Sequence, residues 1–369
     1  MQRITSRVPT VLLLGLALSV SALPVSAASP SLGGISPRGV QRGVENQMVF
    51  NGSRLQDAKE IFFYGPGFEV VKLEAAAGPV KVAVKVLPSC RLGQHIAQVR
   101  TASGVSEYKT FWVGPFGSTP EKEPNSDFAT PQPIPLNITV TGVVQNEDVD
   151  YYVVEAKKGQ RIAAEVEGMR LGTTLFDPYV AILDSKRFEM ASADDSPLVF
   201  QDAVVSAVVP ADGRYIVEVR ESAYAGNGNC RYRLHVGTFP RPTAVYPAGG
   251  QLGQNVEVTF LGDAAGPFKQ TFKLPGEDVE LFEVEPKSGE QVAPSGNRFR
   301  LFPHGNNLEI EPNDEIAKAT PSELPKAFNG IIEKQGDIDF FKFAAKKGQV
   351  FNIECYARRI RSGLDPVMN

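Results

Sequence analysis

Short runs in which apolar and polar residues alternate dominate this sequence. In "DYYVVEA", Tyr152, Val154 and Ala156 share one side of an extended chain, which we expect to face the core, and the run that follows "KKG" alternates in the same way. A period of two is that of a β-strand, and the gap is short enough for a hairpin. Further runs such as "YVAILD" and "GRYIVEVRE" are separated by Asp, Gly and Pro, and no long amphipathic helix is visible. The pattern predicts an all-β protein built from antiparallel sandwiches.

Two parts of the chain repeat each other. "EPNSDFA" from Glu123 returns as "EPNDEIA" from Glu311, 188 positions later. "DVDYYVVEAKKGQ" from Asp148 returns as "DIDFFKFAAKKGQ" from Asp337, 189 positions later. A weaker repeat precedes each copy, as "PRGVQRG" and "PAGGQLG". Internal repetition of this kind indicates duplicated folding units rather than two halves of one active site.

The repeats predict a leader followed by four units. We expect a signal peptide at 1–27, and then unit 1 at 30–115, unit 2 at 119–238, unit 3 at 241–304 and unit 4 at 308–369. Unit 3 is a shorter version of unit 1, and unit 4 is a second copy of unit 2 that lacks a counterpart of 181–236. Half of the sandwich of unit 4 is therefore expected to be missing, which leaves strand edges uncovered.

The first 27 residues indicate export. Two arginines in "MQRITSR" precede the apolar run "VPTVLLLGLALSVSALPV", and Val25 and Ala27 are small residues at the positions before a cleavage site. This order is that of a secretory signal, which predicts a secreted or otherwise extracytoplasmic protein. No later segment approaches the roughly 18 apolar residues of a membrane span. A net charge of −4 gives no electrostatic reason to expect a nucleic acid partner.

The cysteines and histidines give little sign of chemistry. Cys90, Cys230 and Cys355 lie far apart, so no disulfide framework is expected, although an intermolecular disulfide stays open. Cys230 alternates with apolar residues and is expected to be buried and inert. The three histidines, His95, His235 and His304, lie in different units. His235 alternates outward on "RYRLHV", and no hydrolase or metalloprotease motif is present. We therefore expect no intrinsic enzyme activity.

Acidic residues gather at both copies of the stronger repeat. "EKEPNSD" alternates Glu121, Glu123 and Asn125 along an extended chain, and Asp148 and Asp150 could close on them. Ca²⁺ takes six to eight oxygen ligands in a flexible geometry, so such a set predicts a calcium site. The candidate residues are Glu121, Glu123, Asn125, Asp148 and Asp150 in unit 2, and Glu309, Glu311, Asn313, Asp314, Asp337 and Asp339 in unit 4. The alternative is that Glu-Pro-Asn is a turn whose polar side chains bond their own backbone.

Several stretches resemble known families. "EPNSDFA", "GVVQNEDVDYYVVEAKKGQ", "LFDPYVAILD", "PADGRYIVEVRE" and "YRLHV", spread over nearly all of 121–237, resemble the bacterial pre-peptidase C-terminal domain, a jelly-roll-like β-sandwich appended to secreted proteases. "ISPRGVQRG" and "GQHIAQVRTASGVSEYKTFWVG" in unit 1 resemble an immunoglobulin-like IPT/TIG domain. The alternating arrangement is similar to that of large secreted proteins of environmental bacteria, planctomycetes among them. The resemblance implies tandem immunoglobulin-like and jelly-roll-like modules, of which the last is truncated.

The resemblance also implies ligands. In calcium-binding members of the family, the linker that leads into the sandwich supplies ligands of the Glu-x-Glu-x-Asn type. This implies a metal role for Glu121, Glu123 and Asn125, and in the second copy for Glu309, Glu311, Asn313 and Asp314. The first copy has Ser126 where the second has Asp314, and serine is the poorer ligand.

Two functions follow from this sequence. The first is a secreted, non-catalytic protein that acts in adhesion, spacing, or binding of a protein or polysaccharide, with modules rigidified by calcium. The alternative is the accessory portion of a secreted protease whose catalytic domain is absent from this chain.

Overall fold

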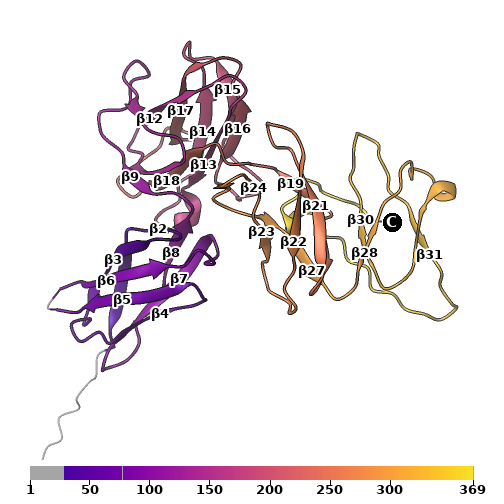
Figure 1. Cartoon of the computed structure of the whole chain (residues 1–369), viewed down its shortest axis with the longest axis horizontal. Helices are drawn as coiled ribbons and strands as arrows, with labels where there is room; N and C mark the ends of the chain where they lie inside the picture. The colour runs from indigo at the N-terminus through magenta and orange to yellow at the C-terminus, as the bar shows by residue number, and fades with distance from the viewer. Residues whose placement is uncertain (1–28, 77, 369) are drawn as a thin grey trace, which may run out of the picture.

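The computed structural model describes residues 29–76 and 78–368, so the predicted signal peptide at 1–27 lies outside the described residues. Within those ranges the chain consists of strands, turns and three short 3₁₀ helices, which confirms the all-β prediction (Figure 1). The strands form many sheets, as expected for tandem β-sandwich modules. No helix in the described part of the chain is long and apolar enough to cross a membrane.

Unit 1 is a sandwich of two four-stranded sheets, with strand orders β1-β3-β6-β5 and β2-β8-β7-β4. Phe50, Val82 and Phe111 fill the space between the sheets and are at most 1% exposed. The strands are β1 (Ser31–Ser36), β2 (Gly39–Gln41), β3 (Glu45–Ser53), β4 (Glu60–Phe63), β5 (Phe68–Glu74), β6 (Val80–Val86), β7 (Gly93–Arg100) and β8 (Lys109–Gly114).

Unit 2 is a sandwich of two five-stranded sheets, with strand orders β10-β12-β17-β14-β15 and β16-β13-β18-β11-β9. Its elements are β9 (Ser118–Pro120), β10 (Gln132–Pro133), β11 (Ile138–Val143), β12 (Val149–Ala156), β13 (Arg161–Glu167), η1 (Met169–Leu171), β14 (Pro178–Leu183), β15 (Glu189–Ala193), β16 (Val204–Val208), β17 (Gly213–Glu221) and β18 (Arg231–Gly237). Cys230 is buried and free, as expected, and Cys90 and Cys355 are also free.

The alternation in β12 correctly predicted its core face, but the hairpin expected between β12 and β13 is wrong. Tyr152, Val154 and Ala156 point into the core of unit 2, and Ile162 of β13 joins them there. However, β12 pairs with β10 and β17, whereas β13 pairs with β16 and β18 in the other sheet. The short "KKG" connection crosses from one sheet to the other, because both runs bury an apolar face in the same core from opposite sides.

Unit 3 has a three-stranded sheet, β19-β21-β22, and several two-stranded pairs around a smaller core that contains Val258 and Phe260. The parallel pair β20–β27 repeats the parallel pair β2–β8 of unit 1. The strands are β19 (Ala244–Tyr246), β20 (Gly249–Gln251), β21 (Asn255–Leu261), β22 (Phe268–Lys273), β23 (Glu283–Val284), β24 (Lys287–Ser288), β25 (Gln291–Val292), β26 (Asn297–Arg298) and β27 (Arg300–Phe302).

Unit 4 contains two parallel strand pairs, β28–β30 and β29–β31. These pairs occupy the repeat positions of β9–β11 and β10–β12 in unit 2, with the same shifts of 188 and 189 positions seen in the sequence. Residues 344–368 form no strand, and Val350 is 91% exposed. The elements are β28 (Asn306–Leu308), η2 (Ile316–Lys318), β29 (Thr320–Ser322), β30 (Ala327–Asn329), β31 (Phe341–Phe343) and η3 (Arg358–Ile360).

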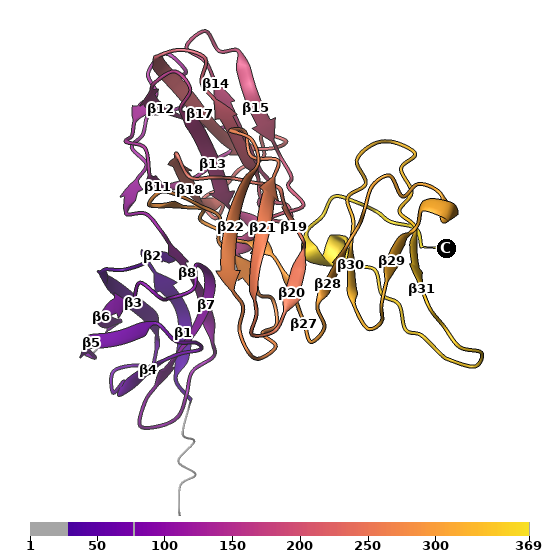
Figure 2. The same ribbon diagram turned by 45° about the vertical axis from the view of Figure 1, so that its right-hand side comes forward.

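Units 1, 2 and 3 contact one another, and most of unit 4 lies beyond unit 3, with Arg361 near its C-terminal end reaching Phe200 of unit 2 (Figure 2). Arg42 of unit 1 and Glu285 of unit 3 form an ion pair at 3.0 Å. Phe116 and Phe239, from the two segments that flank unit 2, pack with Ala163 of unit 2 and Ala293 of unit 3. The first three units therefore share buried contacts, whereas the carboxylate sites lie where the chain passes from unit 1 to unit 2 and from unit 3 to unit 4.

Candidate functional site

The first carboxylate cluster consists of Glu121, Glu123, Asn125, Asp148 and Asp150, and it lies where the chain enters unit 2. Parallel pairing of β9 with β11 holds the start of this segment against the sheet. The backbone N–H of Tyr151 donates to the carbonyl of Asn125 at 3.0 Å, which holds the end of the segment beside β12. Single carboxylate oxygens of Glu123, Asp148 and Asp150 lie within 4.8 Å of one another.

A tyrosine from the far end of unit 2 closes this cluster. The hydroxyl of Tyr232, on β18, donates to Asp150 Oδ2 at 2.6 Å and lies 3.3 Å from Glu121 Oε2. The backbone N–H of Val143 donates to Glu121 at 3.0 Å. Gly142 lies so close that a Cβ there would overlap the Glu121 carboxylate and the Tyr232 ring. The side chains of Glu121 and Tyr232 are therefore packed without spare room.

Burial makes the carboxyl groups of Glu121 and Asp150 weaker acids than they would be in water. Asp150 is fully buried, and this desolvation, together with the charge of Glu121, outweighs the Tyr232 hydrogen bond and raises the pKa of Asp150 to about 8. Burial, reinforced by the charge of Glu123, raises the pKa of Glu121 to about 7 despite the Val143 N–H. Both groups hold protons more firmly than free carboxyls, because no basic side chain of the described residues forms an ion pair with them.

The Asn125 amide can face this cluster in two ways. With its nitrogen toward the carboxylates, it donates to Asp150 Oδ1 and Glu123 Oε2, both at 3.0 Å. With its oxygen toward the carboxylates, Asn125 Oδ1 faces Asp150 Oδ1 and Glu123 Oε2 with no proton between them. The amide nitrogen then lies 3.4 Å from the Tyr152 hydroxyl. The first orientation suits a cluster without metal and the second suits a cluster around a cation, since a cation attracts all three oxygens.

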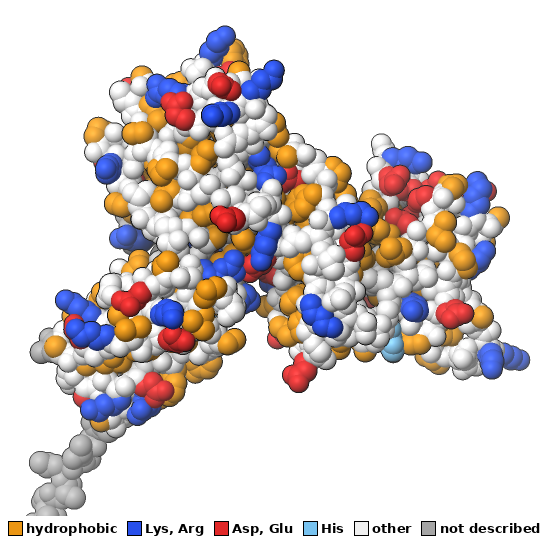
Figure 3. Space-filling model, in the orientation of Figure 1, with side chains coloured by type: hydrophobic (Ala, Val, Ile, Leu, Met, Phe, Trp, Pro, Cys, Tyr) orange, Lys and Arg blue, Asp and Glu red, His pale blue; other side chains and the backbone are white. Residues whose placement is uncertain are grey.

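The second carboxylate cluster consists of Glu309, Glu311, Asn313, Asp314, Asp337 and Asp339, and it repeats the backbone bonds of the first. Ile331 N–H donates to Glu309 at 2.9 Å, as Val143 does to Glu121. The carbonyl of Asn313 accepts from the Phe340 N–H at 3.2 Å, as that of Asn125 does from Tyr151. Single carboxylate oxygens of Glu309, Glu311 and Asp339 lie within 4.8 Å of one another. Acidic side chains gather on the part of unit 4 that faces the viewer in Figure 3.

The second cluster has acceptor atoms without partners. Asn313 is fully buried, and its Oδ1 has no hydrogen-bond partner, nor do Glu309 Oε2 and Asp339 Oδ1. Burial and the charge of Asp339 raise the pKa of Glu309 to about 7. Burial, with the charges of Asp337 and Glu311, also raises the pKa of Asp339. Buried oxygens without a donor are what a hard cation would satisfy.

Three of the candidate residues also contact groups that flank the clusters. Asp148 accepts a bond from Ser126 Oγ at 2.8 Å, so Ser126 is already engaged. In the second cluster, Asp314 takes the place of Ser126, and the Ile338 N–H lies 3.5 Å from it. Asp337 accepts from the Glu333 N–H at 2.6 Å. The donor set of carboxylate and amide oxygens therefore fits Ca²⁺. The converging residues are Glu123, Asn125, Asp148 and Asp150 in the first cluster, and Glu309, Glu311 and Asp339 in the second.

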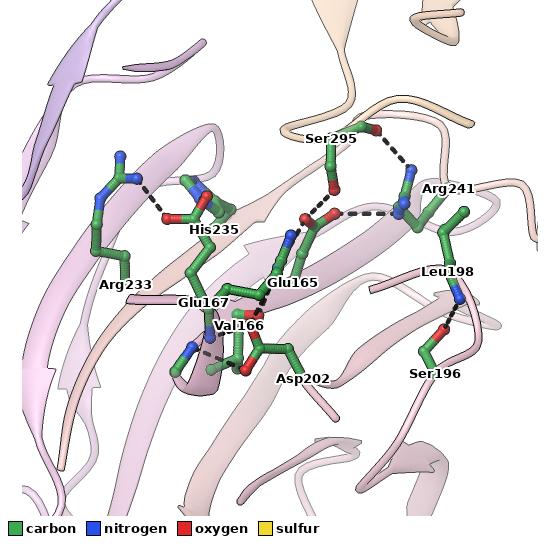
Figure 4. A network of polar contacts seen from close by, with 12 residues as sticks. Glu165, Val166, Glu167, Ser196, Leu198, Asp202, Arg233, His235, Arg241 and Ser295 are labelled. Atoms are coloured by element: carbon green, nitrogen blue, oxygen red, sulfur yellow. Dashed lines mark hydrogen bonds and ion pairs between the residues drawn. The ribbon is translucent and has the colours of Figure 1, made fainter. Parts of the chain in front are cut away.

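Sequence reasoning missed a buried charged network on the outer face of β13 and β18 (Figure 4). Glu165 forms ion pairs with Arg170 at 3.3 Å and with Arg241 at 3.1 Å, and Ser295 of unit 3 donates to it. Arg233 pairs with Glu167. Glu165 and Arg241 come from units 2 and 3, so these ion pairs link the two units.

The expectation that His235 alternates outward needs correction. His235 does point away from the core of unit 2, but it is fully buried, with Nδ1 2.8 Å from Thr139 Oγ1 and Nε2 3.3 Å from Glu167. The reason is that unit 1 covers this face: a Cβ on Gly114 would lie 3.4 Å from the His235 ring, and one on Gly39 would overlap Arg233. The sequence did contain a sign of this network: Glu165 and Glu167 alternate on β13, as do Arg233 and His235 on β18, which pairs with it.

Comparisons with known proteins give similar folds only. No family model matches the chain, and no curated protein matches it. Among solved structures, the pre-peptidase C-terminal domain of a collagenase from Bacillus anthracis is 17% identical, with 31% of this chain and 99% of that one covered at a TM-score of 0.24. PliG from Aeromonas hydrophila, a periplasmic inhibitor of g-type lysozyme, is 16% identical over 29% of this chain and 95% of its own, at a TM-score of 0.23.

Some matches that cover more of this chain are to immunoglobulin-like chains. The ICAM-5 D1–D4 ectodomain fragment is 10% identical, with 66% of this chain and 69% of that one covered at a TM-score of 0.20. At identities of 17% or less and TM-scores of 0.24 or less, these likenesses assign no function to this chain, and nothing in them bears on a planctomycete source. The chain is thus similar to pre-peptidase C-terminal and immunoglobulin-like structures.

Proposed function

We propose that this chain is an exported, non-catalytic protein whose β-sandwich units bind or space partners outside the cytoplasm, and that calcium rigidifies the entrances of units 2 and 4. The observation that carries the proposal is the repetition of one arrangement. In both clusters a glutamate accepts from a backbone N–H of the segment paired with the start of the unit, and a buried asparagine carbonyl accepts from the N–H that follows the second aspartate. Two copies of the same oxygen-lined entrance favour a shared structural role.

Calcium would act on the segment that joins neighbouring units. Glu123 and Asn125 come from the linker that leads into unit 2, whereas Asp150 comes from β12. A cation bound by both parts would neutralise the buried carboxylates and tie the linker to the sandwich. Glu311 and Asn313 on one side and Asp339 on the other have the same relation in unit 4. The segment between β9 and β10, and its counterpart between β28 and β29, would thereby be fixed on its own unit.

The placement of the histidines supports a non-catalytic role. His95 is buried in unit 1 against Phe68 and Phe111, and burial lowers its pKa to about 4. His235 is fixed within the buried network between units 1 and 2. His304 lies beside Phe302 in unit 3. A general base needs a titratable group near neutral pH within reach of a nucleophile, and these three surroundings favour structural roles.

Thermal unfolding with and without calcium tests the proposal. Purified protein should unfold at a temperature at least about 4 °C higher in millimolar Ca²⁺ than in chelator, because ligand binding to the folded state stabilises it. Glu123→Ala should remove most of the shift that belongs to unit 2, whereas the exposed Glu290→Ala of unit 3 should leave it unchanged. Asn125→Asp, which keeps a ligand oxygen, should retain the shift. Equal unfolding temperatures in calcium and chelator would rule out calcium rigidification.

A further inference from the structure

A cavity of about 530 Å³ lies between unit 3 and the C-terminal segment of unit 4. Residues 278–282 and 298–301 of unit 3 form one wall, and 356 together with 358–361 form the other. In Figure 2 the yellow helical turn near the centre, η3, lies against the orange strands of unit 3. The volume falls within the range of small-ligand sites, which is about 300–1,000 Å³.

Guanidinium groups dominate the polar lining of this cavity. Arginines at five positions line it, namely Arg298, Arg300, Arg358, Arg359 and Arg361. Three of them have carboxylate partners: Arg298 pairs with Glu283 at 3.2 Å, Arg358 with Asp365 at 3.7 Å and Arg359 with Glu354 at 3.6 Å. Among the residues that the structure describes, Arg300 and Arg361 have no such partner. Arg300 and Arg361 therefore form no ion pair of their own, and the charges of Glu354 and Glu283 act on them only from a greater distance.

Aromatic rings hold the unpaired guanidiniums in place. Arg361 lies over the Phe200 ring, with its guanidinium carbon 3.2 Å from the ring centroid, and Arg300 lies over Tyr356 at 5.0 Å. A guanidinium that stacks through its face keeps its N–H edges free to donate in its own plane. Arg300 Nε and Arg298 Nη1 are buried and have no hydrogen-bond partner. These donors are thus prearranged for a planar anionic group.

The positive charges also act on one another. Burial lowers the pKa of Arg361, and the neighbouring Arg298 lowers it further. A bound anion would relieve this repulsion as well as satisfy the free N–H groups.

The rest of the lining distinguishes between kinds of anion. Exposed Asp278 and Glu280 stand on the unit 3 wall beside apolar Leu281 and Phe282. Carboxylates repel a simple anion but accept hydrogen bonds from hydroxyl groups. A sugar that carries a carboxylate or sulfate supplies an anion for the arginines, hydroxyls for the acids and a C–H face for the apolar side chains. Inorganic sulfate supplies only the anion.

We infer that this cavity between units 3 and 4 binds an acidic sugar of a polysaccharide, with Arg300 and Arg361 contacting its anionic group and Asp278 and Glu280 its hydroxyls. The inference rests on the proposed binding role, for which it names the ligand class. It does not depend on calcium, so the thermal-unfolding test and the sugar-binding test can fail separately.

Calorimetric titration of the whole protein tests the inference. The probes are tetragalacturonate, a chondroitin sulfate tetrasaccharide, neutral maltotetraose, a tetraglutamate peptide and sodium sulfate. We expect at least one of the two acidic sugars to bind about tenfold or more tightly than maltotetraose, the peptide and sulfate. Equal binding of sulfate would show an ion site only, preferential binding of the peptide would show a peptide site, and no binding by either sugar would overturn the assignment.

Variants locate the binding and separate charge from hydroxyl recognition. Arg361→Gln and Arg300→Gln should each weaken sugar binding about tenfold, whereas the exposed Arg214→Gln of unit 2 removes the same charge and should have no effect. Asp278→Ala should weaken sugar binding, although removal of a negative charge would strengthen binding of a simple anion. Because Arg361 also contacts Phe200, the thermal unfolding midpoint of each variant must match that of the parent protein. Stronger binding by Asp278→Ala, or no change in Arg300→Gln and Arg361→Gln, would contradict the inference.

Discussion

The two carboxylate clusters are built from the same motif but are enclosed differently. In unit 2, Tyr232 comes from β18 to contact Glu121 and Asp150, and the buried acids have donors. In unit 4, no strand of the described residues takes the place of β18, and Glu309 Oε2 and Asp339 Oδ1 lack partners. Ser126 bonds Asp148 in the first cluster, whereas Asp314 brings another carboxylate in the second.

This difference shows which contacts of a carboxylate cluster come from nearby in the sequence and which come from distant residues. The glutamate and asparagine bonds to backbone form in both units, so the linker and the strand pairs beside it are enough to assemble the oxygens. Burial and closure come from residues more than 80 positions further along the chain. We therefore expect the first cluster to contribute more to stability and the second to bind calcium more tightly, because it holds more charge and fewer competing donors.

The largest expected effect is that of replacing by alanine the glycine that lies against the acidic side chains in each copy, Gly142 in unit 2 and Gly330 in unit 4. Gly142→Ala would push a Cβ into the packed Glu121 and Tyr232 side chains and should destabilise unit 2 by about 2–3 kcal/mol. Gly330→Ala meets only the half-exposed Glu309 and Asp339, so it should cost about 1 kcal/mol or less. Urea unfolding measures both.

Gly228→Ala, where a Cβ would meet nothing within 4 Å, is the matched control for the glycine substitutions. Equal losses of stability at Gly142 and Gly330 would show that the two clusters are packed alike, contrary to this account.

Removal of the closing hydroxyl should have the next largest effect. Tyr232→Phe leaves the buried Asp150 Oδ2 without the hydroxyl that donates to it, and should lower the free energy of unfolding by about 2 kcal/mol in chelator. Tyr215→Phe, which removes a single bond to the Ala211 carbonyl, should cost about 1 kcal/mol and serves as the control. If both substitutions cost the same in urea unfolding, Tyr232 does not stabilise the acid cluster.

Exchanging the residues at the one candidate ligand position that differs, Ser126 in the first cluster and Asp314 in the second, should reverse the order of the two calcium affinities. Ser126→Asp gives the first cluster the carboxylate of the second and should tighten its calcium binding about tenfold, or about 1.4 kcal/mol. Asp314→Ser should weaken the second site by a similar factor. Calorimetry on both variants measures the change. Affinities that do not respond at either position would place Ser126 and Asp314 outside the ligand set.

Calcium binding should also depend on pH in a defined direction. The pKa values of Glu121, Asp150 and Glu309 are raised to about 7, 8 and 7, so without metal these groups favour the folded state most at low pH. That contribution is lost as pH rises from about 4 to about 8 and the folded protein must give up the protons. Calcium competes with the same protons, so its affinity should rise severalfold between pH 6 and pH 8.

Titration at pH 6 and pH 8 in buffers of different ionisation enthalpy would detect the released protons. Binding without proton release at pH 6 would mean that Glu121, Asp150 and Glu309 are not the groups that meet the metal.

The sequence predicted local features better than long-range ones. Alternation in β12 identified Tyr152, Val154 and Ala156 as core residues, because burial of one face imposes a period of two. The hairpin after β12 was wrong because a short gap does not say whether the chain turns within a sheet or crosses to the opposite one. The carboxylates of each repeat do lie together, while their binding of calcium stays a prediction.

Contacts between distant parts of the chain were beyond the sequence pattern. Tyr232 reads as an ordinary core residue of β18, and its hydroxyl bond to Asp150 depends on how β12 and β18 face each other across the sandwich. His235 was predicted to face outward, because a strand pattern distinguishes two faces but does not say what covers the outer one. Only the packing of units 1 and 3 on that face makes it a buried charged network.

The stoichiometry of calcium binding tests the central claim most directly. Purified wild-type protein, the pair Glu123→Ala with Asn125→Ala, the pair Glu311→Ala with Asn313→Ala, and all four substitutions together would be titrated with calcium at pH 8. Two independent entrance sites predict two bound ions for the wild type, one for each pair and none for the fourfold variant. A single ion lost in both pairs would mean one shared site, and an isotherm without heat at millimolar calcium would contradict the metal assignment itself.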